Sequence, residues 1–265
     1  MKITIITCCY NRVDTLAESL RSAMAQDYGD IEHIIVDGAS TDGTLDIIRK
    51  AEAEVQTPAF RKAHPGYHLR VISEPDTGMY NALNKGLRAA TGDVITWLHS
   101  DDTFYDNSTL SATAEAIEGT GCEFLYANGL YVRADAPEHV VRDWQGGEFA
   151  AWKVRQGWLP LHTTCYVRRE TVERLGGYDE RYRIASDTDW LLRYMRTEGL
   201  RVAYLRRYVV RMKMGGLSTN TSSWKKMWRE DVAIFRAQGI RCAQLHKLEK
   251  MSWKVPQYVR ALFHP

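Results

Sequence analysis

The chain has 265 residues, of which 45% are hydrophobic and 26% are charged, an ordinary composition for a globular protein of one large or two small domains. No apolar run is long enough to cross a bilayer, which excludes a membrane-spanning helix. The net charge of +2 conceals an asymmetry, because residues 201–265 carry a balance of +11 and the first 200 residues carry −9. A basic C-terminal segment on an acidic body indicates an anionic partner, such as a membrane surface, a phosphorylated ligand or nucleic acid.

The first half of the sequence alternates between strand-like and helix-like segments. Strands are predicted over residues 2–7, 32–37, 69–73 and 93–98, helices over 13–26, 44–54 and 79–90, and a surface loop over 56–67. This order predicts an α/β fold with a mostly parallel sheet and helices on both of its faces.

The second half is less regular. We expect a helix over 107–118, a strand over 124–127, a hairpin within 130–144, an aromatic loop over 152–161, a strand over 162–167, helices over 170–175 and 187–198, and strands over 202–205 and 208–214. Two basic helices are expected over 222–237 and 242–262, and Pro256 should kink or interrupt the second.

The cysteines indicate the cellular compartment. Their number is odd and they show no metal-ligand spacing: Cys8, Cys9, Cys122, Cys165 and Cys242. We interpret them as reduced core residues of a cytosolic protein. The sequence starts with a strand, without a charged region followed by an apolar one, so we expect no signal peptide.

Polar, mostly acidic clusters follow each of the four first-half strands, at residues 7–12, 37–42, 74–84 and 101–102. In a parallel sheet these clusters lie on one edge, where α/β proteins place their ligands. Asp101 and Asp102 are adjacent carboxylates, which repel each other unless a cation lies between them and a ligand. They indicate a divalent metal holding a diphosphate, and the alternative is a solvated turn.

The other clusters have structural interpretations beside the functional ones. Asn11 or Asp14 is a candidate N-cap of the first helix, and Asp42 or Thr41 is a candidate cap of the second. Asp37 is a candidate acceptor of hydrogen bonds from a base or ribose. Lys85 is a candidate to neutralise a phosphate or a sugar carboxylate, although a lone helical lysine is usually solvated.

Several motifs occur in a fixed order along the chain: Thr7-x-x-Tyr10-Asn11-Arg12, Asp37-Gly38-x-Ser40-Thr41-Asp42-Gly43-Thr44, Asp76-Thr77-Gly78-Met79-Tyr80-Asn81-Ala82-Leu83-Asn84-Lys85-Gly86, Ala90-Thr91-Gly92-Asp93 and Ser100-Asp101-Asp102. Their combination resembles the family 2 glycosyltransferases of the GT-A fold. The resemblance covers roughly residues 1–220 and is strongest over the first 105. It implies a mostly parallel central sheet with flanking helices, extended here by a basic helical C-terminal segment.

The resemblance implies that a UDP-, GDP- or dTDP-linked sugar donor binds across the sheet edge. The candidate donor-binding residues are Thr7, Tyr10, Asn11, Arg12, Asp37, Ser40, Asp76, Lys85 and Asp101. Asp101 would face the ribose or the metal shell, and Asp102 would ligate Mn2+ or Mg2+. His99 and Ser100 stand where relatives often carry Asn-Ala or another acid, which should alter the edge of the site but not the ligand.

A later segment, residues 184–193, matches the Glu-Asp motif that precedes a helix in this family. Asp187 falls on the Asp that acts as the catalytic base, while Ser186 departs from the Glu. The structural alternative is that Asp187 caps the helix, and Asp189 is the second candidate base. A base of this kind would take the proton of an acceptor hydroxyl, and a single displacement would invert the anomeric centre.

Three residues before Asp187 have both acceptor and core interpretations. Trp158 and Tyr178 are candidates to stack on a sugar ring, but buried aromatic residues usually form core, which we favour for Tyr178. His162 is a candidate contact to the metal or diphosphate, or a structural histidine. The segment Gly215-Gly216-Leu217-Ser218 resembles one that closes over phosphates in some relatives, or it forms an ordinary turn.

The C-terminal segment interleaves tryptophans with basic residues: Trp224, Trp228 and Trp253 with Lys225, Lys226, Arg229, Lys247, Lys250 and Lys254. This composition is typical of a helix at a membrane interface and would suit a lipid-linked acceptor. The alternative is a helix that packs its tryptophans on the domain and leaves its basic residues solvated.

We therefore expect a GT-A domain over residues 1–220, with a nucleotide-binding half (1–105) and an acceptor half (106–220), and a basic helical tail over 221–265. The expected activity is inverting, metal-dependent sugar transfer to a saccharide or lipid-linked acceptor in surface polysaccharide or glycolipid synthesis, in the cytoplasm or peripherally at the inner face of the plasma membrane. The alternative is a non-catalytic nucleotide-sugar binding module, because Ser186 breaks the acidic pair. We expect no nucleic-acid partner, since no groove-reading motif is present, and no dinucleotide site, since no Gly-x-Gly-x-x-Gly follows the first strand.

Overall fold

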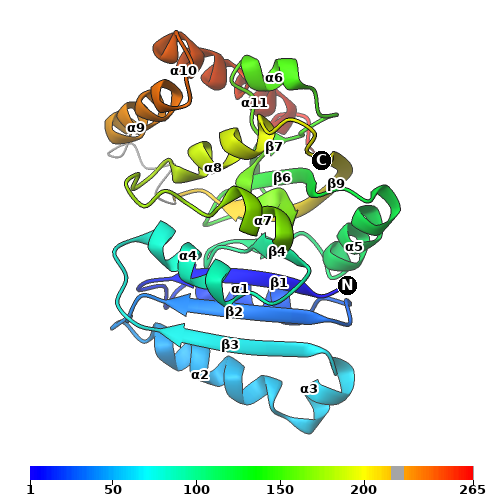
Figure 1. The fold of residues 1–265 in the computed structure, drawn as a ribbon. Helices are drawn as coiled ribbons and strands as arrows, with labels where there is room; N and C mark the ends of the chain where they lie inside the picture. The colour runs from blue at the N-terminus through cyan, green and yellow to red at the C-terminus, as the bar shows by residue number, and fades with distance from the viewer. Residues whose placement is uncertain (216–223, 265) are drawn as a thin grey trace.

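The computed structural model describes residues 1–215 and 224–264 (Figure 1). Its strands are β1 (Ile3–Cys9), β2 (Ile31–Asp37), β3 (Tyr67–Ser73), β4 (Val94–Trp97), β5 (Thr103–Phe104), β6 (Phe124–Val132), β7 (Val140–Trp144), β8 (Cys165–Arg168) and β9 (Val202–Lys213). Its helices are α1 (Leu16–Met24), α2 (Thr44–Val55), α3 (Pro58–Ala63), α4 (Met79–Ala89), α5 (Thr109–Thr120), α6 (Ala151–Arg155), the 3-10 turn η1 (His162–Thr164), α7 (Arg169–Leu175), α8 (Ser186–Met195), α9 (Trp224–Ala237), α10 (Ala243–Ser252) and α11 (Val255–Ala261).

The strands form one sheet in the order β3-β2-β1-β4-β8-β6-β9-β5, and β7 pairs with β6. β3, β2, β1 and β4 are parallel neighbours, as expected of strands joined by crossover helices. β8 runs antiparallel to both β4 and β6, and β5 and β7 are also antiparallel to their neighbours. The α/β class with flanking helices is confirmed. The sheet is mixed, because the second half contributes the antiparallel strands β8, β5 and β7 as well as the parallel pair β6 and β9.

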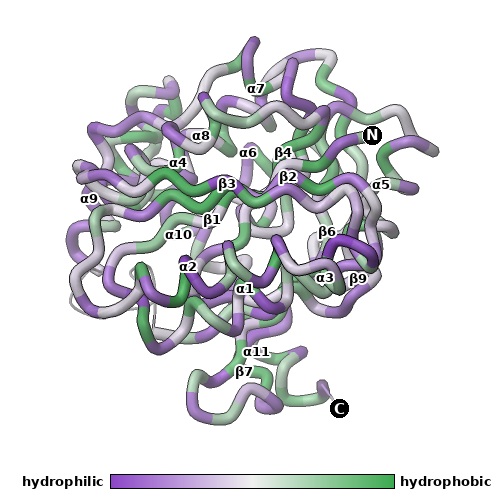
Figure 2. Tube along the Cα trace, turned by 90° about the horizontal axis from the view of Figure 1, so that it is seen from below, coloured by the Kyte–Doolittle hydropathy of each residue, from purple (hydrophilic) through white to green (hydrophobic). Residues whose placement is uncertain are grey.

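Both faces of the sheet are covered by helices. Every residue of β1 and β2 is buried, which is typical of central parallel strands. Figure 2 shows α4 and α8 on one side of these strands and α1 and α2 on the other. Trp97 and Trp190 are fully buried in the α4 and α8 layer, and Ile5 and Leu16 in the α1 and α2 layer.

The C-terminal helices pack onto this body. Ile234 and Phe235 of α9 are fully buried in the same core cluster as Trp190 of α8. Pro256 lies in the first turn of α11, so the predicted interruption of the last helix is confirmed. α11 lies against β7 and projects with it at the C-terminal end of the chain (Figure 2). Within the described ranges, no helix combines the length and apolarity needed to cross a bilayer.

Several local expectations are corrected. The predicted loop over 56–67 contains α3, whose first turn is capped by the Thr57 hydroxyl accepting from the Phe60 N–H. The predicted loop over 152–161 begins with α6, and the predicted strand over 162–167 begins with η1. The two strands expected over 202–205 and 208–214 form the single strand β9, whose register against β6 shifts where Arg206 and Arg207 are skipped. The hairpin expected within 130–144 is confirmed as the β6–β7 pair.

Candidate functional site

A cavity of about 690 Å³ lies at the carboxyl ends of β1 and β4. Its walls come from these strand ends, the start of α4, the loop leading into η1, the N-terminus of α8, the end of β9, and α10 and α11. The parallel order of β1 to β4 therefore brings the predicted strand-end clusters to one edge, where ligands bind in α/β sheets.

Six of the predicted site residues line this cavity: Tyr10, Arg12, Asp76, Asp101, Asp102 and Asp187. Tyr10 is 59% exposed, so its ring is free to meet a ligand. The residues that are not part of the cavity wall are Thr7, Asn11, Asp37, Ser40 and Lys85.

Asp37 does not line the cavity, but it links the ends of neighbouring strands beside it. It is fully buried and accepts hydrogen bonds from the Ser40 N–H at 3.1 Å and from the Ser73 hydroxyl at 2.7 Å. The neighbouring Gly38 lies so close to the cavity-lining Asp76 that a Cβ there would be 2.5 Å from the Asp76 Oδ2. Asp37 thus ties the ends of β2 and β3 together beside the cavity.

The remaining predicted residues also make internal contacts. The Thr7 hydroxyl is 2.9 Å from His33 Nε2 inside the sheet, and burial lowers the pKa of His33 to about 3. Asn11 has a left-handed backbone (φ +51°), and its N–H donates to the Ser40 hydroxyl at 2.9 Å. The Lys85 ammonium group pairs with Glu74 at 2.9 Å and donates to the Pro75 carbonyl at 2.8 Å, so it pins the loop before α4.

Asp102 is the buried member of the adjacent pair Asp101 and Asp102, which forms the acidic edge of the cavity. It is 2% exposed, and its Oδ2 has no hydrogen-bond partner among the described residues. Burial, together with the neighbouring Asp101 carboxylate, raises the pKa of Asp102 well above its usual range. An orphaned buried carboxylate oxygen that faces a cavity is the feature expected of a cation ligand.

The donor set at this edge fits a metal held jointly with a substrate. The described residues contain no group of three or more His, Cys, Asp or Glu side chains arranged to enclose an ion. Mg²⁺ and similar ions commonly bind one or two carboxylates and take their other ligands from water and phosphate oxygens. Asp102 and Asp101 meet that requirement, whereas a closed protein cage is not present in residues 1–215 and 224–264.

Asp187 lies at the start of α8, whose N-cap is Ala185. Its Oδ1 accepts from the Thr188 N–H at 2.8 Å and from the Tyr80 hydroxyl at 3.3 Å. Burial raises the pKa of Asp187, while the Lys250 charge lowers it and the Asp231 charge raises it. A partly buried carboxylate with a raised pKa on a cavity wall is suited to accept a proton.

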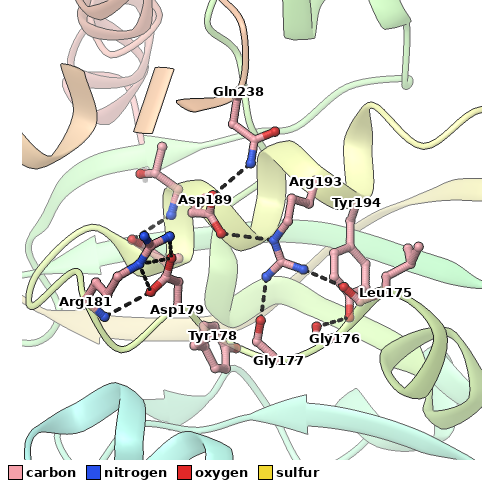
Figure 3. A network of polar contacts seen from close by, with 12 residues as sticks. Leu175, Gly176, Gly177, Tyr178, Asp179, Arg181, Asp189, Arg193, Tyr194 and Gln238 are labelled. Carbon is pink, nitrogen blue, oxygen red and sulfur yellow. Dashed lines mark hydrogen bonds and ion pairs between the residues drawn. The ribbon is translucent and has the colours of Figure 1, made fainter. Parts of the chain in front are cut away.

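Asp189, the second candidate base, does not line this cavity. Figure 3 shows its carboxylate between Gln238 and Arg193, which donate to it at 2.8 and 2.9 Å. The Arg193 guanidinium group also donates to the carbonyl oxygens of Leu175 and Gly177. Asp189 therefore belongs to a network that joins α8 to the loop after α7 and to the end of α9.

The aromatic residues before Asp187 form a packed layer behind the cavity. Tyr178 is 5% exposed and stacks on Trp190, as expected for core. His162 and Trp158 are also buried, but both contribute to the cavity wall. His162 Nε2 contacts the Tyr178 hydroxyl, and its ring stacks on His99 at 5.9 Å. Of the predicted phosphate-closing segment, only Gly215 lies within the described residues.

Sequence reasoning missed the basic side of the cavity. Arg142 from β7, Lys247 and Lys250 from α10, and Lys254 at the α10–α11 junction all line it. The composition of the C-terminal segment predicts membrane-facing or solvated positions for the three lysines, yet Lys247 is only 3% exposed. Their spacing of three and four residues places them on one helical face, which is the signal that could have identified this wall. Cys242 is exposed, which corrects its assignment to the core, whereas the other four cysteines are buried.

Comparison with known proteins decides the family. The model of glycosyl transferase family 2 matches residues 4–174 of this chain. The chain belongs to glycosyltransferase family 2. This confirms the resemblance carried by the strand-end motifs.

Two curated relatives of this family 2 glycosyltransferase are mycobacterial proteins. It is 30% identical over 217 residues to a PGL/p-HBAD biosynthesis glycosyltransferase of Mycobacterium bovis (strain BCG / Pasteur 1173P2), covering 81% of this chain and 78% of the relative. It is also 30% identical over 200 residues to an uncharacterized glycosyltransferase of Mycobacterium tuberculosis (strain ATCC 25618 / H37Rv), covering 72% and 68% of the two chains.

Solved structures share the fold. S. aureus TarS 1-349 in complex with UDP-GlcNAc is 21% identical with a TM-score of 0.66, and the match covers 88% of this chain and 65% of that chain. The mannosyltransferase PcManGT from Pyrobaculum calidifontis, in complex with GDP-Man and Mn2+, is 21% identical with a TM-score of 0.62, covering 99% and 74%. These likenesses confirm the GT-A fold expected for this glycosyltransferase, including its C-terminal helices.

Proposed function

We propose that this family 2 glycosyltransferase is an inverting, metal-dependent enzyme that moves a sugar from a nucleotide-sugar donor to a hydroxyl of a saccharide or lipid-linked acceptor. The observation that carries the proposal is that Asp102 and Asp187, far apart in the sequence, line the same cavity. Asp102 has one carboxylate oxygen without a partner among the described residues, which suits a cation, and Asp187 has a carboxylate suited to accept a proton.

The donor end of the cavity is the sheet edge. Tyr10, Arg12, Asp76 and Asp101 supply an aromatic ring, a cation and acceptor oxygens there, which suit a nucleoside diphosphate. Solved relatives of the same fold were crystallised with UDP-GlcNAc and with GDP-Man and Mn2+, which supports a nucleotide-sugar donor here. UDP-, GDP- and dTDP-linked sugars are the candidate donors, which carry uracil, guanine and thymine respectively.

The metal proposal is Mn2+ or Mg2+, held by Asp102 with Asp101 beside it. When bound, such an ion supplies Lewis-acid stabilisation of the negative charge on a departing nucleoside diphosphate. The protein's own part is to keep Asp102 buried with its Oδ2 unpaired among the described residues, so that this oxygen is available as a ligand.

Asp187 is the proposed base. Its Oδ1 is held by the Thr188 N–H and the Tyr80 hydroxyl, so the carboxylate is fixed in the cavity wall and its other oxygen is left to face an acceptor. As the acceptor oxygen attacks the anomeric carbon, its proton passes to Asp187 and the bond from that carbon to the diphosphate breaks. One displacement of this kind inverts the anomeric centre.

The outer face of α11 supports a peripheral membrane position, as a lipid-linked acceptor would require. Val255, Val259, Leu262 and Phe263 are exposed apolar residues, while Lys254, Gln257 and Tyr258 face the cavity. A helix with one face toward the site and an apolar face toward solvent is suited to lie at an interface. We place the enzyme in the cytoplasm, peripherally at the inner face of the plasma membrane.

The alternative is a non-catalytic nucleotide-sugar binding module. Ser186 stands at the position of the family's Glu, is fully buried, and its hydroxyl has no partner among the described residues. A thermal-shift panel of UDP-, GDP- and dTDP-sugars with and without Mn2+ would identify the donor, because a bound ligand raises the melting temperature. Metal-dependent release of the nucleoside diphosphate, with an acceptor or with water, supports the enzyme. Donor binding without any release of product supports the binding module.

A further inference from the structure

Four basic residues from the second half of the chain form one part of the cavity wall. This cationic wall consists of Arg142, Lys247, Lys250 and Lys254. Arg142 comes from β7, and its guanidinium group is positioned by Gln257 of α11 and by the ring of Tyr131 at 4.6 Å. The wall therefore joins β7, α10 and α11.

The charges of the cationic wall are only partly compensated. Asp231, which is fully buried, pairs with Lys247 and with Lys250, the latter at 3.0 Å. Arg142 has no carboxylate partner among the described residues, and the Lys254 ammonium group has neither a hydrogen bond nor an ion pair there. Burial and the neighbouring cations lower the pKa of Lys254 to about 8. Unpaired cations held together at a cost in free energy indicate that an anion completes the site.

The position of the cationic wall relates it to the proposed base rather than to the donor end. Lys250 donates to the Thr188 hydroxyl at 2.6 Å, and Thr188 directly follows Asp187. The wall is also fixed against the loop before η1, since a Cβ on Gly157 would lie 2.5 Å from the Lys250 backbone nitrogen. The base must contact the acceptor hydroxyl, so this side of the cavity is the acceptor side.

We propose that the cationic wall binds a phosphate group carried by the acceptor, close to the hydroxyl that receives the sugar. The assignment rests on the proposed function, because it uses Asp187 to define the acceptor side. A guanidinium fork and ammonium groups that converge on one space match the oxygens and the negative charge of a phosphate. The acceptor class is therefore a phosphorylated saccharide or a lipid-phosphate, rather than a neutral sugar.

The test uses inorganic phosphate as the probe and calorimetric titration of the whole chain without nucleotide. Lys254→Gln removes an ammonium group that has no partner to lose, so the fold should be retained, and Arg142→Gln is a second variant. Lys226→Gln is the matched control, because Lys226 is an exposed lysine of α9. We expect phosphate to bind the wild-type chain and the control alike, and at least about tenfold more weakly to Lys254→Gln and Arg142→Gln.

A second arm separates acceptor phosphate from donor diphosphate. Phosphate is titrated into protein saturated with Mn2+ and with whichever of UDP, GDP or dTDP stabilises it most. If phosphate binds as tightly with the nucleotide present as without it, the acceptor assignment is supported. If the nucleotide displaces phosphate, the cationic wall binds the diphosphate of the donor and the assignment is overturned. Equal phosphate binding by wild type and Lys254→Gln, or none by wild type, overturns the cationic wall as an anion site. Absence of binding by all three nucleotides would instead count against the proposed function, while the first arm still reports on the wall.

Discussion

The Lys250 ammonium group lies 2.6 Å from the Thr188 hydroxyl, and so joins α10 to the first turn of α8 beside Asp187. The same ammonium group pairs with Asp231 of α9 at 3.0 Å. The C-terminal helices thus form part of the wall of the cavity. Their charge acts directly on the proposed base, because Lys250 lowers the pKa of Asp187 and Asp231 raises it.

Replacing Asp187 should lower the catalytic rate, whereas replacing Asp189 should lower the stability of the fold. We expect Asp187→Asn to lower kcat by about a hundredfold to ten-thousandfold with little change in the KM for the donor, because the variant loses only the proton acceptor. Asp189→Asn is the matched control. It should retain activity and lower the free energy of unfolding by about 1–3 kcal/mol, since Arg193 loses its carboxylate partner. Steady-state kinetics and urea denaturation measure both, and a larger loss of kcat in Asp189→Asn would reverse the assignment.

The pH dependence of kcat should report on Asp187. Only the ionised carboxylate accepts a proton, and burial raises its pKa, so the acidic limb of the profile should lie above the usual range of an aspartate. Lys250→Gln removes a positive charge that favours the ionised form, so the limb should move to higher pH. Lys226→Gln, which changes an exposed lysine, should leave it in place. A limb that moves to lower pH in Lys250→Gln would contradict the electrostatic argument.

Much of this site follows from the sequence because it depends on strand order. Once β1 to β4 are recognised as parallel, Asp101 and Asp102 must reach the edge that also carries Tyr10 and Asp76. Strand order does not predict whether a polar residue at a strand end faces the ligand or the interior of the protein. Asp37 turns toward Ser40 and Ser73 and supports the edge from behind, because its hydrogen bonds with backbone and hydroxyl groups are satisfied there.

The basic tail could not be placed from the sequence in the same way. The alternation of Trp and Lys fits a membrane surface and a packed helix equally, and the choice depends on which surface α10 meets in three dimensions. Lys247 is buried because Asp231, on another helix, compensates its charge. By contrast, the sequence alone predicts that Asp187 and Asp189 have different surroundings, since residues two apart on a helix point to different sides.

Native cysteine reactivity should be confined to one thiol. Cys8, Cys9, Cys122 and Cys165 are buried, and burial raises the pKa of each of these four thiols, so few thiolates form near neutral pH. Cys242 is exposed at the start of α10. We expect a thiol reagent to label one cysteine rapidly in the folded protein and all five after denaturation. Cys242→Ser should lose the rapid phase, and rapid labelling that persists in this variant would show that a buried thiol is accessible.

The apolar face of α11 should control membrane binding. Leu262 and Phe263 are each 81% exposed, and replacing both by Ser should lower co-sedimentation with vesicles of phosphatidylcholine and phosphatidylglycerol about tenfold or more, since each loses most of its apolar area. Val13→Ser, on the exposed surface before α1, is the control and should bind as wild type does. Equal sedimentation of wild type, the double variant and Val13→Ser would contradict the proposed membrane position, but it would not bear on the proposed function of the cavity.

The central claim is that Asp102 holds a divalent ion that the donor shares, in the same cavity as the base. Calorimetric titration of the donor identified by the thermal-shift panel, with Mn2+ and with EDTA, tests it most directly in wild type, Asp102→Asn and Asp187→Asn. We predict Mn2+-dependent donor binding in wild type and Asp187→Asn, and loss of that dependence in Asp102→Asn. Mn2+-dependent binding of undiminished affinity in Asp102→Asn would contradict the account.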